Sequence, residues 1–330
     1  MSHITDMASA FQDSALLFAA SDLGVFGGLA KRGEATAQDL ASDLKLDLRA
    51  TALILNACVA AGLLEKSADR FRNTPEAELS LVPGKKGDLS TALIYMRDVY
   101  PAWGCLMAFG KSGMPVERPE LHLGDDEART RGFVMSMHGK ALATAEPILS
   151  QLSLAGCRRL LDVGGGPGTY SVLLSRAYPE LEATVLDLPP VILIAETLIE
   201  HQGASDRVKT IAGDYHTIAF PNGNDAVLFF GMLHQESAES IQALLNKAYA
   251  SLNPGGSVYV MDMMTDATHT APKFSAMFAV NMALTSKSGW VFSSEELSRW
   301  LEMSGFQSVE VSALPPPVPH WLAKARKPQA

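Results

Sequence analysis

The sequence predicts an α/β protein made of a mostly α-helical N-terminal region and a C-terminal domain built on a seven-stranded sheet with a reversed terminal strand. Two observations predict the sheet. From residue 160 onward, apolar stretches of strand length alternate with stretches of helical length, a pattern typical of a parallel sheet with helical crossovers. The first strand ends in a glycine-rich turn at residues 164–168. A third observation, helical spacing followed by two short strand-like runs before residue 75, predicts a separate N-terminal region.

Composition restricts the possible functions of the chain. Its 330 residues, 47% hydrophobic and 19% charged, are enough to bury a large core. The net charge of −9 argues against a nucleic-acid-binding surface. Three scattered cysteines and the absence of a signal-like or membrane-length apolar run indicate a cytoplasmic protein with no membrane association. Neither cysteines nor histidines have metal-ligand spacing, so no metal is predicted.

The N-terminal region has the element order of a winged helix. Helical spacing covers residues 8–30, a second helix starts within 36–40, and a third covers 48–61. Two short strands, 63–66 and 70–73, follow as a wing. Because winged helices often bind DNA, a DNA-binding regulator is a rival class.

The third helix argues against that rival. It carries Arg49 and then mostly apolar residues, whereas a recognition helix needs several polar side chains that face the bases. The apolar composition of residues 8–30 fits packing against a second subunit better.

The strands of the C-terminal domain are separated by helices at residues 170–177, 191–201 and 240–252. A proline-rich turn, rather than a helix, separates the last two strands, which allows an antiparallel pair. The predicted strands cover residues 160–163, 183–186, 208–211, 226–230, 257–261, 309–312 and 321–325.

The glycine turn indicates the kind of ligand. Gly164, Gly166 and Gly168 alternate, and Thr169 stands where a dinucleotide fingerprint has its third glycine. No Lys-Ser or Lys-Thr pair follows, as a phosphate-binding P-loop would require. The pattern suits a ligand with a ribose and an amino-acid tail but no phosphate, which is S-adenosylmethionine (SAM). An NAD-dependent oxidoreductase is the rival enzyme class and is disfavoured by Thr169.

Candidate ligand-binding residues follow the ends of four strands: Gly164, Asp187, Asp214 and His234. In an open parallel sheet, ligands bind at the carboxyl ends of the strands, so these residues should share one cleft. Asp187 is placed to accept hydrogen bonds from ribose hydroxyls. Asp214 can receive the adenine amine, and Tyr215 offers adenine a flat face. The alternative for Asp214 is a carboxylate that caps a turn.

The ordered motifs resemble the class I SAM-dependent small-molecule O-methyltransferases of the caffeate, acetylserotonin and bacterial polyketide type. The N-terminal half resembles the dimerisation region of that family, so the resemblance covers nearly the whole chain and implies a Rossmann-like sheet and a homodimer. The matching pieces are Leu-Asp-Val-Gly-Gly-Gly-Pro-Gly-Thr-Tyr (161–170), Val-Leu-Asp-Leu-Pro (185–189), Gly-Asp-Tyr (213–215), Leu-His (233–234) and Leu-Asn-Pro-Gly-Gly (252–256).

The resemblance implies roles for single residues. His234 matches the general base, a role that suits imidazole near neutral pH, and Asp262 matches the acid that orients it. Leu188 and Phe230 join the cofactor residues, although many plant members have lysine at the position of Phe230. Two further departures weaken the case for a base. Gln-Glu replaces Asp-Trp after His234, and no second acid follows Gly289.

The acceptor pocket is expected outside the sheet. Phe133 and Met137 lie in a helical run that matches a substrate-contacting segment of the family. Asn281 and Met282 lie in a second run that also matches such a segment. Trp103 is a further candidate. Met and Phe at helical spacing are also common in cores, so a purely structural role stays open.

Together these observations predict a SAM-dependent methyltransferase for a small-molecule acceptor, with a hydroxyl oxygen favoured. The alternatives are an S- or N-methyltransferase that needs no base, and a regulator that binds SAM or DNA without catalysis. The predicted domains are a dimerisation domain at 1–100, a helical connector at 101–155 that contributes to the substrate pocket, and a SAM-binding domain at 156–330.

Overall fold

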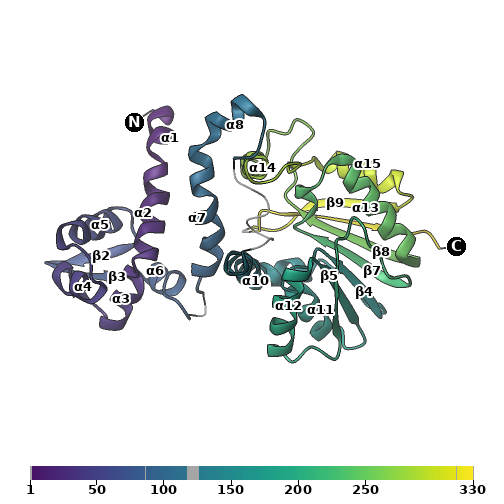
Figure 1. Ribbon diagram of the computed structural model, residues 1–330, viewed down its shortest axis with the longest axis horizontal. Coiled ribbons are helices and arrows are strands. Elements are labelled where there is room, and N and C mark those ends of the chain that lie inside the picture. The colour runs from purple at the N-terminus through teal and green to yellow at the C-terminus, as the bar shows by residue number, and fades with distance from the viewer. Residues whose placement is uncertain (1, 86, 117–125, 317, 330) are drawn as a thin grey trace. The chain divides into compact units, whose positions relative to one another are not determined.

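The computed structural model describes residues 2–85, 87–116, 126–316 and 318–329. The chain divides into two compact units, Met1–Arg97 and Asp98–Ala330. Figure 1 labels most of the helices and strands of both.

The first unit begins with three helices, α1 (His3–Ser9), α2 (Phe11–Asp22) and α3 (Val25–Arg32). The sequence predicted helical structure across 8–30 without a break. The break between α2 and α3 falls at Gly24, whose φ of 77° is left-handed. Only glycine adopts this conformation without a steric penalty, so the residue that ends α2 also turns the chain into α3.

The predicted winged-helix elements follow in order. Helix α4 (Ala37–Leu44) starts with a capping box in which Thr36 and Asp39 bond reciprocally, and α5 covers Leu48–Ala60. Strands β2 (Leu64–Ser67) and β3 (Arg70–Asn73) pair antiparallel, and β1 (Ala35–Thr36) adds a third short strand beside β3. Helix α6 (Pro75–Ser80) ends the motif.

The second unit contains the predicted seven-stranded sheet, in the order β6-β5-β4-β7-β8-β10-β9. Strands β4 to β8 are parallel, and β10 is antiparallel to both β8 and β9. The reversed terminal strand is therefore confirmed. The strands are β4 (Arg159–Val163), β5 (Glu182–Asp187), β6 (Val208–Ala212), β7 (Asn224–Phe230), β8 (Leu252–Asp262), β9 (Gln307–Ala313) and β10 (Trp321–Arg326).

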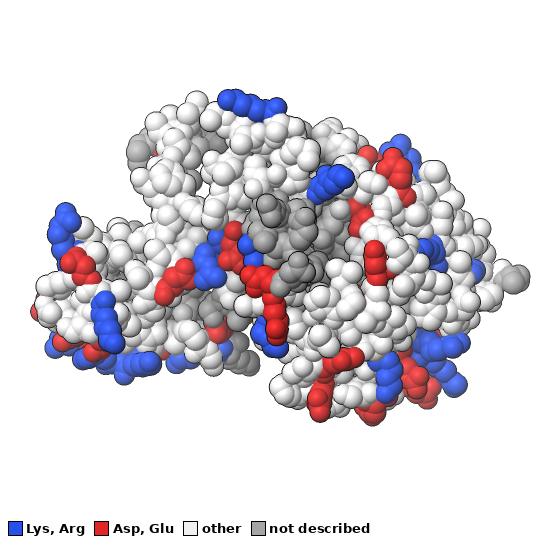
Figure 2. Space-filling model, viewed as in Figure 1, with Lys and Arg blue, Asp and Glu red and all other residues white. Residues whose placement is uncertain are grey.

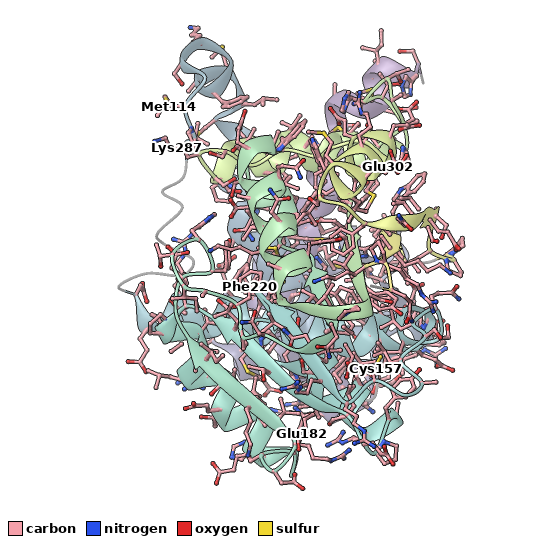
Figure 3. All side chains as sticks on the ribbon, turned by 90° about the vertical axis from the view of Figure 1, so that its right-hand side faces the viewer. Met114, Cys157, Glu182, Phe220, Lys287 and Glu302 are labelled. Atoms are coloured by element: carbon pink, nitrogen blue, oxygen red, sulfur yellow. The ribbon has the colours of Figure 1, made fainter. Side chains whose placement is uncertain are left out.

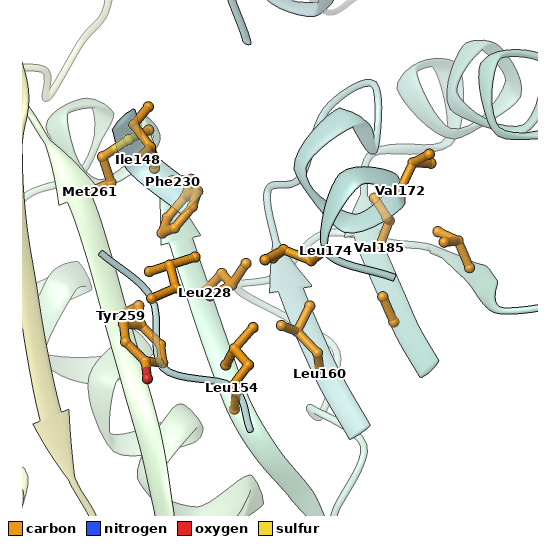
Figure 4. Close-up of a cluster of buried hydrophobic side chains, with 14 of the residues drawn as sticks. Ile148, Leu154, Leu160, Val172, Leu174, Val185, Leu228, Phe230, Tyr259 and Met261 are labelled. Carbon is orange, nitrogen blue, oxygen red and sulfur yellow. The ribbon is translucent and has the colours of Figure 1, made fainter. Parts of the chain in front are cut away.

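Alternate residues along each strand pack into two separate cores, one on each face of the sheet. In β7, Leu228 and Phe230 belong to one core, while Val227 and Phe229 belong to the other. This period of two follows from strand geometry, which points successive side chains to opposite faces. Figure 4 shows the first core. Helices α11 (Thr169–Ala177) and α12 (Pro189–His201) cover that face, and α13 (Ala238–Ser251) and α15 (Ser294–Met303) cover the other.

Four further helices lie outside these layers, and one of them spans the boundary between the two units. The predicted helical runs at 132–138 and 278–282 fall inside α10 (Glu127–Leu149) and α14 (Lys273–Thr285). Helices α7 (Ser90–Gly104) and α8 (Leu106–Ser112) precede them. Figure 3 shows Glu182, the first residue of β5, and Lys287, just after α14, toward opposite ends of this unit. The loop after α14 thus lies toward the carboxyl ends of the parallel strands.

The surface carries charges of both signs. On the face shown in Figure 2, acidic and basic side chains are interspersed, and wide areas carry neither. Among the described residues, no single helix is both long and apolar enough to cross a membrane, although the bent pair His3–Asp22 and Val25–Arg32 passes on length and composition alone.

Candidate active site

The glycine turn after β4 is joined to the end of β5 through a buried carboxylate. The backbone N–H of Gly166 donates to Asp187 Oδ2 at 2.8 Å, and the N–H of Leu188 donates to Asp187 Oδ1 at 2.7 Å. Each carboxylate oxygen has a second acceptor site, which can receive a ligand hydroxyl. The structure therefore brings the predicted residues Gly166, Asp187 and Leu188 together.

Glycine is required in this turn for two different reasons. Gly164 has a φ of 65°, which L side chains rarely adopt, and an added Cβ would lie 3.1 Å from Met232 Cγ. At Gly165 an added Cβ would come within 2.7 Å of the Asp162 carboxyl carbon. The turn thus keeps its backbone close to Asp162 and leaves no room for side chains.

Two carboxyl groups lie buried in and beside this turn. Burial raises the pKa of Asp162 to about 6, even though the Ser171 hydroxyl donates to its Oδ2 at 2.7 Å. Burial also raises the pKa of Asp187 to about 6, against the lowering effect of the two N–H donors. The cost of holding a charge away from water exceeds the benefit of these hydrogen bonds.

The loop after β6 places Asp214 and Tyr215. Asp214 Oδ1 accepts the N–H of His216 at 2.8 Å, so this side of the carboxylate caps the turn, as the alternative interpretation of the sequence expected. The Tyr215 hydroxyl donates to Glu236 Oε1 at 2.7 Å, and Glu236 Oε2 accepts the Ser240 hydroxyl at 2.6 Å. Burial and the neighbouring Glu236 carboxylate raise the pKa of Tyr215, which keeps the phenol a donor.

His234 and Asp262 form a buried pair. His234 lies in the short 3₁₀ helix η1 (Leu233–Gln235) just after β7, and Asp262 ends the neighbouring strand β8. The distance from His234 Nδ1 to Asp262 Oδ1 is 2.6 Å, and the side chains are 12% and 0% exposed. Asp262 Oδ2 also accepts the backbone N–H of His234 at 3.1 Å, and Oδ1 accepts the N–H of Met263 at 2.8 Å.

This arrangement assigns the two ring nitrogens of His234. With Nδ1–H donating to Asp262, the Nε2 lone pair is the position left for an acceptor proton. The neighbouring Glu236 does not replace the missing second acid, since its carboxylate is bonded to Tyr215 and Ser240. The backbone oxygen of His234 accepts the N–H of Trp290 at 2.9 Å, which fixes η1 from a second side.

Aromatic and amide side chains of α14 lie beside this pair. The Phe278 ring meets the His234 ring edge to face, with centroids 5.1 Å apart, and Phe274 stacks on Phe278 at 6.5 Å. One turn later, Asn281 Oδ1 accepts Trp103 Nε1–H at 2.9 Å. The structure therefore joins two of the predicted substrate residues, Trp103 and Asn281, directly to each other.

The other predicted residues occupy varied positions. Phe133 of α10 packs against a buried cluster that includes residues of α12, and Leu188 packs against the same cluster. The Phe230 ring meets Tyr170 edge to face at 5.2 Å. Met282 is buried and lies beside the backbone of Gly289, and Met137 is half-buried on α10.

Some residues of this region were not predicted as site residues. Phe278 lies one helical turn before Asn281, so helical spacing could have found it. Lys140 lies three residues after Met137 and is placed on the same face by the same spacing. His320 precedes β10, and only the strand register places it near Asp262. His138 contacts the start of α11 through Thr169 Oγ1 at 2.7 Å.

Comparison with known proteins identifies the family. Residues 107–307 match the model of the O-methyltransferase domain, and residues 5–83 match that of the O-methyltransferase dimerisation domain.

The chain belongs to the O-methyltransferase family. It is 32% identical over 311 residues to 3-hydroxy-5-methyl-1-naphthoate 3-O-methyltransferase of Streptomyces sahachiroi, covering 93% of this chain and 89% of that protein. It is 26% identical to acetylserotonin O-methyltransferase of Rattus norvegicus, over 93% of this chain and 73% of that protein. The fold matches human N-acetylserotonin methyltransferase in complex with SAM, with a TM-score of 0.87, 23% identity and coverage of 99% and 97%.

Membership confirms three predictions: a SAM-dependent methyltransferase, the α/β fold and the N-terminal dimerisation domain. The residues present also fit the cofactor. The backbone of Gly164, Gly165 and Gly166 carries no side chains and is partly exposed, and Asp187 provides oxygens suited to a ribose diol. These residues, with Leu188, Tyr215 and Phe230, would hold SAM at the carboxyl edge of the sheet.

We expect Asp187→Ala to weaken SAM binding by roughly 1.5–3 kcal/mol, the scale of hydrogen bonds to a charged group. Isothermal titration calorimetry with SAM and with S-adenosylhomocysteine measures the loss. Asp225→Ala, a carboxylate at the opposite end of the sheet that accepts the N–H groups of Arg158 and Arg159, is the matched control. Equal affinities for wild type and Asp187→Ala would remove Asp187 from the cofactor site.

The raised pKa of Asp162 predicts a pH-dependent stability. Because its folded pKa is about 6 and its ordinary value is 3.8, the protonated form stabilises the fold at low pH, and that contribution is lost as the pH rises from about 4 to 6. Asp162→Asn keeps a neutral acceptor for Ser171. The variant should therefore gain stability relative to wild type over this range, by at most about 3 kcal/mol. Urea unfolding of the ligand-free proteins at pH 4, 5, 6 and 7 tests this, and a pH-independent difference would contradict it.

Proposed function

We propose that this O-methyltransferase transfers the methyl group of SAM to a hydroxyl oxygen of a small aromatic acceptor, with His234 as the general base. The observation that carries the proposal is the 2.6 Å hydrogen bond from His234 Nδ1 to a fully buried Asp262. The aromatic neighbours Phe278 and Phe274 support a flat acceptor. The similar protein of Streptomyces sahachiroi is named for methylation of a hydroxynaphthoate.

In this mechanism SAM supplies an electrophilic methyl group on a sulfonium. His234 Nε2 takes the hydroxyl proton as the acceptor oxygen forms its bond to the methyl carbon and the carbon–sulfur bond breaks. Asp262 holds the required tautomer and stabilises the imidazolium that results. Phe278 limits the movement of the imidazole and excludes water from one side.

Two parts of the chain are proposed to form the acceptor pocket. The connector at 101–155 would supply Trp103, Phe133 and Met137, and α14 would supply Asn281 and Met282. The hydrogen bond between Trp103 and Asn281 supports this, because it joins the two parts within one unit.

Transfer to nitrogen is the second candidate. The single acidic partner of His234 among the described residues is Asp262, because Glu236 is bonded elsewhere. A neutral amine needs no base, and a protein 29% identical to this chain is named as the N,N-dimethyltransferase OxyT of Streptomyces rimosus.

His234→Ala separates these candidates. If His234 removes a proton, kcat should fall about 10²–10⁴-fold while SAM affinity is retained. Asp262→Asn should also lower kcat, since it removes the carboxylate that holds the tautomer of His234 and stabilises the imidazolium. The measurement is kcat against pH on an acceptor found by product mass.

A different result would support the second candidate. If the variant stays within a few-fold of wild-type kcat and mainly raises KM, with a shallow pH profile, His234 positions the acceptor and does not act as a base.

We further propose a homodimer formed through the N-terminal unit. The match to the dimerisation domain supports this, and so do three large apolar side chains that are exposed in the single chain: Ile4 at 76%, Met7 at 60% and Phe11 at 59%. Exposed apolar residues that lie close together on one helical stretch are typical of a subunit interface.

Met7→Glu combined with Phe11→Glu should weaken the dimer without unfolding the unit, because neither side chain belongs to its core. Two buried charges at an interface cost several kcal/mol, enough to raise the dimer dissociation constant by 10²-fold or more. Light scattering over a concentration series measures the change. An unaltered dimer would place the interface elsewhere. Gln12→Glu, on the same helix, controls for added charge.

A further inference from the structure

A buried carboxylate follows His234 by two residues. Glu236 caps the C-terminal end of η1, and only 7% of the residue is exposed. A carboxylate held away from water needs polar partners within the protein, because burial removes its hydration. Glu236 stands where this sequence departs from the family motif, so its partners have to be explained from this chain alone.

Three polar groups surround the Glu236 carboxylate. The Tyr215 hydroxyl donates to Oε1 at 2.7 Å, and the Ser240 hydroxyl donates to Oε2 at 2.6 Å. The ring Nε2 of His216 lies 3.2 Å from Oε1. Tyr215 and His216 are neighbours in the loop after β6, so both contacts to Oε1 come from that loop.

The main chain of the same loop is held by Lys247 of α13. Its ammonium donates to the backbone oxygens of Tyr215 at 2.8 Å, His216 at 2.7 Å and Ile218 at 3.1 Å. Tyr215 is therefore fixed at both ends, at its carbonyl by Lys247 and at its hydroxyl by Glu236. A side chain bonded in this way has lost most of its rotamer freedom before a ligand arrives.

This restraint bears on the cofactor because Tyr215 directly follows Asp214, beyond the carboxyl end of β6. Its ring is proposed above to face the adenine of SAM. A ring that is already ordered loses little conformational entropy on binding, so preorganisation raises the affinity for the ligand. Loss of the bond to Glu236 would free the ring and leave the phenol without its carboxylate acceptor.

We propose that Glu236 is a positioning residue for the cofactor: its carboxylate holds the Tyr215 ring in the orientation that receives adenine. The inference rests on the proposed place of SAM beside Tyr215 and adds the residue that prepares that place. It does not depend on whether the acceptor atom is oxygen or nitrogen.

The main chain of Glu236 serves a different neighbour. Its backbone oxygen accepts Trp290 Nε1–H at 2.9 Å, and the backbone oxygen of His234 accepts the Trp290 N–H at 2.9 Å. Neither bond uses the Glu236 side chain. Side-chain variants of Glu236 should therefore disturb the cofactor side of the site and leave the turn that carries His234 in place.

The test is a double-mutant cycle on the binding of S-adenosylhomocysteine, measured by isothermal titration calorimetry. Glu236→Leu and Tyr215→Phe each remove one partner of the bond, and each should weaken binding about 5- to 20-fold, the scale of one hydrogen bond. Because both changes break the same bond, the double variant should bind within about 2-fold of the weaker single variant. Glu236→Gln keeps an oxygen that can accept from Tyr215, so its affinity should lie within about 3-fold of wild type.

Glu239→Gln is the matched control, because Glu239 is an exposed carboxylate in the first turn of α13, the helix that carries Ser240. It should bind S-adenosylhomocysteine like wild type. Steady-state kinetics on an acceptor found by product mass give a second readout. In Glu236→Leu the KM for SAM should rise with the dissociation constant, while kcat falls less than about 3-fold. Thermal unfolding shows that each variant is folded.

Three results would overturn the inference: wild-type affinity in a folded Glu236→Leu, wild-type affinity in Tyr215→Phe, and additive losses in the double variant. The second of these is informative even when Glu236→Leu does not fold. Additive losses together with a large fall of kcat in His234→Ala would reject this inference and leave the proposed function in place. Coupled losses together with near-wild-type kcat in His234→Ala would do the reverse.

Discussion

The hydrogen bond between His234 and Asp262 links the ends of two neighbouring parallel strands. The 2.6 Å distance requires β7 and β8 to end at the same level of the sheet. The strand register achieves this by pairing Phe230 of β7 with Met261 of β8. The surrounding contacts depend on this bond. Trp290 bonds to the backbone of His234, and Phe278 packs on its ring. A shift of β8 by one residue would turn Asp262 toward the opposite face of the sheet.

Glu236 is part of the chain's departure from the family motif and connects three neighbouring segments. Its carboxylate bonds to Tyr215 and Ser240, and its backbone oxygen accepts Trp290 Nε1–H at 2.9 Å. One residue therefore ties the loop after β6, the start of α13 and the loop before α15 to the turn that carries His234. The Glu236 carboxylate therefore links the loop after β6 to the turn that carries His234.

Much of the fold and the cofactor side of the site could be predicted, because local sequence determines them. The alternating apolar strands and the glycine turn place Asp187 and His234 with no knowledge of distant contacts. The acceptor side could not be derived in this way. Phe278 and Lys140 look like ordinary residues of apolar helices, and His320 reaches the site only through the register of a reversed strand. The break at Gly24 was also missed, since a single glycine within a helical pattern does not by itself show a positive φ.

The reversed strand β10 has a consequence for how such an enzyme can diversify. The residues proposed to hold the cofactor follow β4, β5 and β6, whereas Phe278 lies on α14 and His320 lies in the turn before β10. The two groups of residues lie on separate segments of the chain. Substitutions that select a new acceptor can therefore accumulate without disturbing methyl-donor binding. A lineage built on this sheet can explore new metabolites while it keeps its chemistry.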